Sequence, residues 1–461
     1  MTALWTSAQI AAATGGRASA DFVATGVTFD SREVGPGDLF VALAGATTDG
    51  HRFVGQALAA GAAGVLVSAS VDGPHVRVAD TTRALDDLAV ARRAASGGRI
   101  IGITGSVGKT GTREALFRAL DRAAPGRVHA SVKSYNNHVG VPLSIARMPE
   151  TAGFGIFEMG MSAAGELAAL TRLVRPHVAL VTWIAPAHSA FFSGEEAIAD
   201  AKGEIFQGLE PGGTALIPHD GVHRERLIGH ARPYASVILT FGRHPDADYR
   251  LIEEVRAEDG VGRVVTAGLP GGRSLTFTVG MAGAHWVNNA LAVIAAVDAV
   301  EGDLGLAGLA LGAMTGLAGR GARHRVALSG GTALLIDESY NANPASMAAA
   351  LAVLGEAEAS GRKIALLGAM KELGGESDAR HAGLAEPLRA SGASHALLVG
   401  AEMAALATAL GTSMAVRHCR DAAEAEEALS ALIAPGDAIL VKGSNSVGLG
   451  RVVAALRAGE S

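Results

Sequence analysis

The sequence predicts an α/β protein of three domains, and three observations support this prediction. The chain has 461 residues, enough for about three domains of ordinary size. Hydrophobic residues make up 49 % of the chain and charged residues 18 %, so there is apolar material for several cores. Short apolar runs alternate with helical segments along most of the chain, which is typical of sheets covered by helices.

The first predicted domain covers residues 1–96 and is small. Its β-branched runs alternate with two helical stretches, which predicts a compact α/β unit. The strand candidates are 38–45, 64–68 and 76–78, and the helix candidates are 51–64 and 81–96. The sequence Ser-Gly-Gly at 96–98 is typical of a linker, so the domain is expected to end there.

The second predicted domain covers residues 97–321 and has the most regular pattern. Five apolar strands separated by helices predict a doubly wound, mostly parallel sheet. These strand candidates are 99–104, 154–158, 178–184, 214–218 and 236–241. Alternating residues with Gly-rich turns at 247–280 predict antiparallel strands at one edge, and two helices are expected at 285–300 and 304–314.

The third predicted domain covers residues 322–461. Apolar runs again alternate with helices, which predicts a second, Rossmann-like α/β sheet of the nucleotide-binding type. The runs read ALLIDE, KIALLGAM, HALLVG, MAVRH and DAILVKG.

Charge and composition exclude several classes of function. The formal net charge is −6 and no basic block is present, so nucleic acid is not expected as the main partner. Cys419 is the single cysteine, which suits a reducing compartment. The N-terminus lacks the pattern of a signal peptide, and no apolar run reaches the ~20 residues of a membrane span. We therefore expect a cytoplasmic protein that acts without a membrane, as a monomer.

The sequence TGSVGKT, which follows the strand candidate 99–104, predicts a phosphate-binding loop. A Gly-rich turn between a strand and a helix directs backbone N–H groups to one point, with the helix dipole behind them. Lys109 would reach the β- and γ-phosphates, and Thr110 would bind Mg²⁺. The usual longer spacing would require glycine where the chain has Ile103, so this is a shorter variant. We predict ATP binding by Thr104, Gly105, Ser106, Val107, Gly108, Lys109 and Thr110.

Three more polar residues are expected at the same sheet edge. Glu158 ends one strand candidate and His188 follows another, and a carboxylate and an imidazole can both hold a divalent cation. Each has an ordinary alternative, a solvated strand end for Glu158 and a backbone-bonded loop histidine for His188. Lys202 follows on the next helical segment, and a charged lysine beside a metal ion would be repelled by it. The residues alone therefore do not assign Lys202 to a metal site.

The order of several motifs resembles the Mur ligase family, whose members form amide bonds at the expense of ATP. The motifs are TGSVGKT, SYNNHVGVPLS, FEMGMS, AHSAFF followed by AKGEIF, GAHWVNNALAV, GR at 319–320 and DESYNANPASM. The resemblance spans essentially the whole chain. The stretch from DSREVGPGDLF to GAAGVLV and the SYNANP motif are most similar to the members that add D-alanyl-D-alanine.

The resemblance implies two Mg²⁺ ions and a carbamylated lysine. CO₂ would convert the Lys202 amine into a carboxylate-like anion, which removes the electrostatic objection to a metal nearby. The resemblance implies that Thr110 and Glu158 hold the ATP-linked ion, and that His188 and carbamylated Lys202 hold the second. Lys109, Glu158, His188 and Lys202 are thus the catalytic candidates.

The resemblance also implies the remaining nucleotide contacts. Asn289 would contact adenine, Arg320 an ATP phosphate and Asp337 the ribose. The alternatives are a helix N-cap for Asn289 and a linker salt bridge for Arg320. Family sequences often have asparagine where this chain has Trp286, which is a departure close to the expected base site.

The implied substrates are UDP-N-acetylmuramoyl-tripeptide and D-Ala-D-Ala. The nucleotide part would bind the first domain, and the peptide part would lie near the reacting carboxylate. The substrate candidates are Ser31, Arg32, Gly45, Asp49, Asn136, Asn137, Tyr340, Asn341 and Asn343. A surface salt bridge is the alternative for Arg32, and simple turn formation is the alternative for the asparagines.

The expected reaction is ligation through an acyl phosphate, with ADP and phosphate as by-products. One rival is a related ligase that adds a single amino acid to a muramoyl peptide or glutamate to a folate. Another is a P-loop switch ATPase that hydrolyses nucleotide without either substrate. Because pieces of the site fall in all three domains, the third domain is expected to close onto the second.

Overall fold

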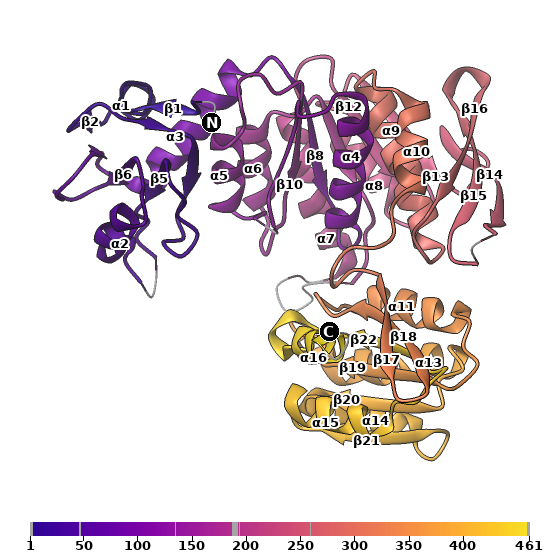
Figure 1. The fold of residues 1–461 in the computed structure, drawn as a ribbon. Coiled ribbons are helices and arrows are strands. Elements are labelled where there is room, and N and C mark those ends of the chain that lie inside the picture. The colour runs from indigo at the N-terminus through magenta and orange to yellow at the C-terminus, as the bar shows by residue number, and fades with distance from the viewer. Residues whose placement is uncertain are drawn as a thin grey trace.

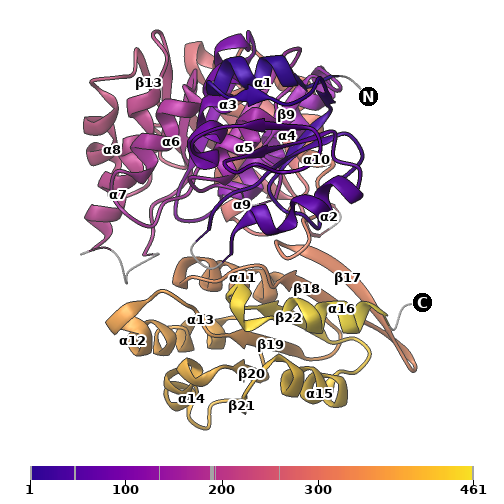
Figure 2. The same cartoon turned by 90° about the vertical axis from the view of Figure 1, so that its left-hand side faces the viewer.

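The computed structural model describes residues 3–45, 48–133, 135–186, 192, 194–258 and 260–458. Its strands form separate sheets within 5–77, 99–279 and 322–442, which confirms the α/β fold class. In Figure 1 the N-terminal part and the central sheet lie side by side, and the C-terminal part forms a lobe below them. Figure 2, viewed from the N-terminal side, shows the same lobe below the other two parts. The sheets agree with the predicted division, and the boundaries at 96/97 and 321/322 stay a prediction.

The N-terminal part contains a five-stranded sheet and a two-stranded one. The larger has the order β2 (Arg17–Ala18), β7 (His75–Arg77), β6 (Gly64–Val67), β5 (Asp38–Val41), β4 (Gly26–Thr28), and β1 (Trp5–Thr6) pairs with β3 (Val23–Ala24). The helices are α1 (Ser7–Thr14), η1 (Gly50–Phe53), α2 (Val54–Ala59) and α3 (Thr81–Ala95). The predicted strands and helices are present, whereas α1 and β1–β4 were not predicted. Strands of two or three residues are too short for a clear period.

The N-terminal part is anchored to the central part through α3. This helix packs on α5 (Gly140–Ala146), and Leu143 and Ala146 belong to the N-terminal core. The buried Arg92 guanidinium lies 4.2 Å from the Trp5 ring centre and 2.7 Å from Glu150. The two parts therefore share one apolar core with polar links at its rim.

The central sheet has nine strands and is parallel except at one edge. Its order is β16 (Arg273–Val279), β15 (Arg263–Leu269), β14 (Tyr249–Arg256), β13 (Val237–Gly242), β12 (Thr214–Pro218), β11 (Val178–Val181), β8 (Arg99–Thr104), β10 (Phe154–Glu158), β9 (Val128–Ala130). The pairs of β15 with β14 and with β16 are antiparallel, as predicted. The first strand, β8, lies between β10 and β11, so the strand order reverses there. In open α/β sheets ligands bind at this switch point.

Helices cover both faces of the central sheet. One face packs against α4 (Lys109–Ala123), α9 (His285–Ala299) and α10 (Leu304–Gly312). The other packs against α5, α6 (Glu166–Val174), α7 (Glu195–Gly203), η2 (Glu204–Gly208) and α8 (Arg224–Ala231). Neighbouring residues of β8 serve opposite faces, Ile101 the first core and Ile100 the second. A strand buried on both faces explains the continuous apolar run.

The C-terminal part has a six-stranded sheet that is parallel except for one pair. The order is β17 (Ala322–Leu328), β18 (Gly331–Glu338), β22 (Ala438–Lys442), β19 (Lys363–Gly368), β20 (His395–Val399), β21 (Ala415–Cys419). One face carries α11 (Pro344–Glu356), α12 (Ser377–Ala382), α13 (Ala385–Ala390) and α14 (Ala404–Leu410), and the other α15 (Ala422–Leu432) and α16 (Gly450–Ala458). Short 3₁₀ turns are η3 (Pro270–Gly272), which belongs to the central part, and η4 (Gly374–Glu376), η5 (Ala401–Met403) and η6 (Asn445–Val447).

Within the described ranges, no helix is both long and apolar enough to cross a membrane.

Candidate active site

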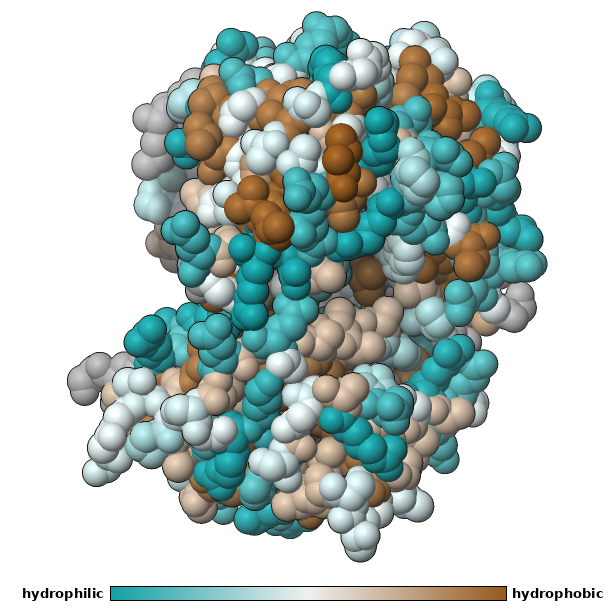
Figure 3. Space-filling view, turned by 90° about the vertical axis from the view of Figure 1, so that its right-hand side faces the viewer, coloured by the Kyte–Doolittle hydropathy of each residue, from teal (hydrophilic) through white to brown (hydrophobic). Residues whose placement is uncertain are grey.

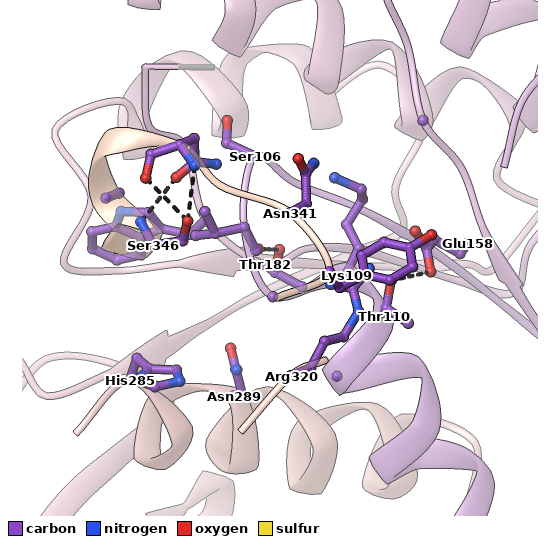
Figure 4. Close-up of a pocket in the computed structure, with 18 of the residues that line it drawn as sticks. Ser106, Lys109, Thr110, Glu158, Thr182, His285, Asn289, Arg320, Asn341 and Ser346 are labelled. Atoms are coloured by element: carbon purple, nitrogen blue, oxygen red, sulfur yellow. Dashed lines mark hydrogen bonds between the residues drawn. The ribbon is translucent and has the colours of Figure 1, made fainter. Parts of the chain in front are cut away.

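A cavity of about 590 Å³ lies where the central part meets the C-terminal lobe (Figure 4). The central part contributes the loop after β8, the ends of β10 and β11, the last turn of α7 and the start of α9. The C-terminal lobe contributes the end of β18, the loop after it, the start of α11 and the end of β22. The cavity therefore forms only when both parts are in this arrangement.

The loop after β8 has the conformation that the TGSVGKT motif predicts. Gly105 and Gly108 have φ of 150° and 87°, and α4 begins directly after them at Lys109. Thr182, at the end of β11, donates its hydroxyl to Val107 O at 2.6 Å and to Thr104 O at 3.2 Å. In the part of the chain that the structure describes, no side chain caps the N-terminus of α4. The first turn of α4 is thus a place for an anion.

Gly105→Ala is expected to distort this loop. An added Cβ would stand 1.9 Å from Thr182 Oγ1, at a φ that side chains rarely adopt, which costs about 1–3 kcal/mol in strain. We expect a lower melting temperature and weaker nucleotide binding, measured by calorimetry. Gly97→Ala is the control because open space surrounds that glycine. Equal nucleotide affinity in the two variants would contradict the assignment of the loop.

Four predicted residues meet at the switch point. Glu158 is 2 % exposed, and its two carboxylate oxygens accept hydrogen bonds from Thr110 Oγ1 and Asn136 Nδ2, each at 2.9 Å. Lys109 Nζ donates to Gly105 O at 2.5 Å. Burial lowers the pKa of Lys109, while the nearby Glu158 charge partly restores it. The solvated strand end considered for Glu158 is wrong, because its carboxylate is buried.

Lys202 lies in the last turn of α7 and lines the same cavity. It is 1 % exposed, and none of the residues that the structure describes forms a hydrogen bond or ion pair with its amine. Burial, helped by the neighbouring charge of Lys109, holds the pKa of Lys202 well below its usual value. Both effects favour the neutral, nucleophilic form of this amine relative to that of an exposed lysine. The predicted His188 lies outside the described residues.

The nucleotide candidates Asn289 and Arg320 both line the cavity. Asn289 is the fifth residue of α9, whose N-cap is Ala284, so the N-cap alternative is wrong. Its side chain lies beside Gly108, where an added Cβ would be 3.0 Å from Asn289 Oδ1. Trp286, the departure from the family pattern, packs its ring over Gly111 of α4. The adenine contact itself stays a prediction.

Arg320 and Asp337 are placed differently. The Arg320 guanidinium stacks on Tyr340, 4.0 Å from the ring centre, and forms no ion pair within the described ranges, which contradicts the linker salt bridge. Asp337 is 4 % exposed and does not line the cavity. Its carboxylate accepts hydrogen bonds from Gly319 N at 2.7 Å and Ser339 Oγ at 2.6 Å, which holds the turn before Arg320. A ribose contact by Asp337 remains untested.

The substrate candidates of the SYNN and SYNANP motifs share one location. Asn136, Asn137, Tyr340, Asn341 and Asn343 all line the cavity. Asn343 caps α11, because its side chain accepts from Ser346 N at 2.9 Å, and Asn137 accepts from Gly140 N at 2.9 Å at the start of α5. Both therefore also make the local turns that were the alternative. Helix α11 begins at Pro344, directly after the Asn343 cap.

Three residues at the site, Thr182, Glu338 and Lys442, are not among the predicted site residues. Thr182 holds the phosphate loop, and Glu338 lines the cavity beside Lys442. Glu338 and Lys442 are register partners on β18 and β22, with Lys442 Nζ 3.5 Å from Glu338 Oε2 and 2.9 Å from Asn341 O. Burial lowers the pKa of Lys442 and raises that of Glu338. Glu338 and Lys442 are the last residues of their strands and Thr182 directly follows β11, and this position at a strand's carboxyl end is the signal that could have identified them.

The N-terminal candidates do not line this cavity. Arg32 forms an ion pair with Asp30 at 2.6 Å with its side chain 83 % exposed, so the surface salt bridge considered for it is present. Asp49 accepts from His51 N at 2.9 Å, and Gly45 N donates to Thr48 O. A ligand role for Ser31, Arg32, Gly45 and Asp49 stays a prediction.

Comparison with known proteins identifies three family domains in order. A Mur ligase catalytic domain matches residues 23–93, the Mur ligase middle domain matches 103–297, and the Mur ligase glutamate ligase domain matches 319–445. The UDP-N-acetylmuramoyl-tripeptide–D-alanyl-D-alanine ligase of Escherichia coli K12 is 34 % identical over 95 % of each chain.

Two solved structures extend the likeness. The MurF crystal structure from Acinetobacter baumannii has a TM-score of 0.85 at 28 % identity, covering 99 % of both chains. MurF from Thermotoga maritima in complex with ADP has a TM-score of 0.78 at 25 % identity, covering 94 % of this chain and 97 % of that one. Because the three family domains follow one another along nearly the whole chain, the protein belongs to the Mur ligase family.

Proposed function

We propose that this protein joins D-Ala-D-Ala to UDP-N-acetylmuramoyl-tripeptide, with ATP converted to ADP and phosphate. The observation that carries the proposal is that the phosphate loop and the SYNANP residues line one and the same cavity. We infer the two substrates from the relatives that are named for this activity. The product, UDP-N-acetylmuramoyl-pentapeptide, is a peptidoglycan precursor. We also propose that the protein is cytoplasmic and that it is a monomer.

The reaction needs a phosphoryl transfer because a carboxylate is a poor electrophile. A carboxylate oxygen of the tripeptide attacks the γ-phosphorus, and the bond from that phosphorus to the ADP oxygen breaks. The dipeptide amine then attacks the carbonyl carbon of the acyl phosphate and loses a proton, and inorganic phosphate leaves. Catalysis therefore consists of holding the two substrates in line and balancing phosphate charge.

The chain's own groups bind and orient the phosphates. The N–H groups at the start of α4 and the Lys109 amine face the cavity, where they would hold the β- and γ-phosphates. Arg320 approaches from the C-terminal lobe, already oriented by Tyr340. Asn136 and Asn341 lie close enough to the same cavity to orient the reacting carboxylate. We assign adenine to Asn289, and we assign Asp337, which lies outside the cavity, to the turn that carries Arg320.

The residues present fit Mg²⁺. Thr110 Oγ1 and a carboxylate oxygen of Glu158 lie 2.9 Å apart and both face the cavity, and oxygen ligands are those that Mg²⁺ prefers. We propose that these two residues hold one ion, and that His188 and carbamylated Lys202 hold a second. Bound Mg²⁺ would neutralise negative charge on the transferring phosphoryl group.

The environment of Lys202 also fits carbamylation. An amine adds to CO₂ only in its neutral form, and the low pKa of Lys202 favours that form. The buried amine lines the cavity and has no partner among the described side chains. A carbamate formed on it would therefore face a metal ion bound in the cavity. This assignment turns an unfavourable pair of cations, Lys109 and Lys202, into an attractive one.

A substrate panel tests the proposed function. Purified protein is given ATP with UDP-N-acetylmuramoyl-tripeptide and either D-Ala-D-Ala, single amino acids or no amine, and products are read by mass spectrometry. We expect a product carrying the dipeptide, with phosphate release that requires both substrates. A product with one added amino acid would support the related ligases instead, and phosphate release without either substrate would support a switch ATPase.

A further inference from the structure

A set of ion pairs, which we call the interdomain clamp, joins the β14–β15 hairpin to the end of α11. Its ion pairs join Arg243, Glu254, Arg263 and Glu356, and Arg256 adds a hydrogen bond to the Glu356 backbone carbonyl and an ion pair with Glu358 at 3.9 Å. Arg263 lies at its centre, with Nη1 2.9 Å from Glu254 Oε1 and Nη2 2.7 Å from Glu356 Oε2. Figure 3 views the molecule from the side of the hairpin, and hydrophilic side chains gather at the waist between its two lobes.

The hairpin side of the clamp is well shielded. The side chains of Arg263 and Glu254 are 19 % and 13 % exposed, and Arg243 holds the second Glu254 oxygen at 2.7 Å. Ion pairs at exposed positions contribute little, whereas the shielded pair of Arg263 and Glu254, each of which also has a second charged partner, is screened less. Arg263 is therefore fixed on the central sheet before it reaches across to the other lobe.

On the α11 side of the clamp, Glu356 accepts hydrogen bonds from two arginines. Arg263 holds the Glu356 carboxylate, and Arg256 Nη2 donates to the Glu356 backbone carbonyl at 3.2 Å. Glu356 is the last residue of α11, so its carbonyl is one of those left without a helical partner. Arginine at a helix C-terminus also complements the helix dipole.

Helix α11 connects this clamp directly to the cavity. It has 13 residues, about 20 Å of rigid rod, and begins at Pro344 immediately after the SYNANP asparagines. Asn343 caps its first turn, and Ser346 and Ala349 line the cavity. A shift at Glu356 would therefore move Asn341 and Asn343 relative to the phosphate loop.

We propose that Arg263 and Glu356 are positioning residues that hold the C-terminal lobe in the arrangement that completes the ATP site. This inference rests on the proposed function for its kinetic consequence. When only a fraction of the molecules is in the binding-competent arrangement, the apparent affinity for ligand falls by that fraction. Loss of the clamp should thus raise the KM for ATP and leave kcat at saturating ATP nearly unchanged.

The test is a double-mutant cycle with Arg263→Gln, Glu356→Gln and the double variant. We expect each single variant to raise the KM for ATP about fivefold, the effect of one partly shielded ion pair, with kcat within about twofold. The double variant should be no worse than either single variant, because both act through one contact. Glu376→Gln is the control, since Glu376 pairs with Arg380 inside the C-terminal lobe at 3.0 Å and should change nothing.

Other outcomes would overturn the clamp. These are an unchanged KM, a lower kcat with unchanged KM, or multiplied effects in the double variant. Binding of a non-hydrolysable ATP analogue, measured by calorimetry, repeats the cycle without ligation and should show the same pattern. If wild-type protein fails to ligate, the proposed function fails, while the calorimetric cycle still decides the clamp.

Discussion

Lys202→Ala is expected to lower the ligation rate by about a hundredfold or more, comparable to the loss of one preorganised group that stabilises the transition state. The protein should remain folded, because the Lys202 amine is buried and the described residues give it no partner to lose. Lys202→Arg should be equally inactive, because a guanidinium keeps the charge and cannot form a carbamate. Rates of ligation and thermal unfolding are measured for both variants.

Two controls make the Lys202 experiment specific. Lys363→Ala removes a lysine whose amine bonds to Gly355 O at 2.5 Å and that does not line the cavity, so its rate should stay near wild type. Removal of dissolved CO₂ should lower wild-type activity, and bicarbonate should restore it. An active Lys202→Arg variant, or activity indifferent to CO₂, would refute carbamylation.

Lys109→Ala is expected to abolish ATP turnover, with a loss of about a thousandfold. Lys109 is the first residue of α4, and its amine donates to Gly105 O of the phosphate loop and feels the charges of Glu158 and Arg320. Without it, charge on the transferred phosphoryl group loses its nearest fixed cation. Phosphate release and ADP formation measure the loss, and near-normal turnover would rule out this role.

The repeating pattern of the two large sheets made most of the fold predictable. Strands such as β8 and β19 are buried on both faces and read as continuous apolar runs, so they were evident, whereas the short strand β9 was not predicted. Strand β17 was not predicted, because it lies at a sheet edge and has the polar run Arg-His-Arg near its start instead of an apolar run. Which strands pair with each other cannot be predicted from a short stretch of sequence, because paired strands lie far apart in the chain.

The same distinction explains the site. The phosphate loop is a local motif, so Lys109 and Thr110 followed from the sequence. Thr182 and the Glu338–Lys442 pair depend on which strands become neighbours, β8 with β11 and β18 with β22. Lys202 became a candidate only through the family resemblance, because its chemistry depends on burial that sequence alone does not reveal.

Isotope transfer tests the central claim of an acyl-phosphate mechanism most directly. The tripeptide is prepared with ¹⁸O in its reacting carboxyl group and is incubated with ATP and D-Ala-D-Ala. One labelled oxygen should appear in the inorganic phosphate for each peptide bond formed, because that oxygen leaves with the phosphoryl group. Unlabelled phosphate beside a normal yield of product would contradict the mechanism.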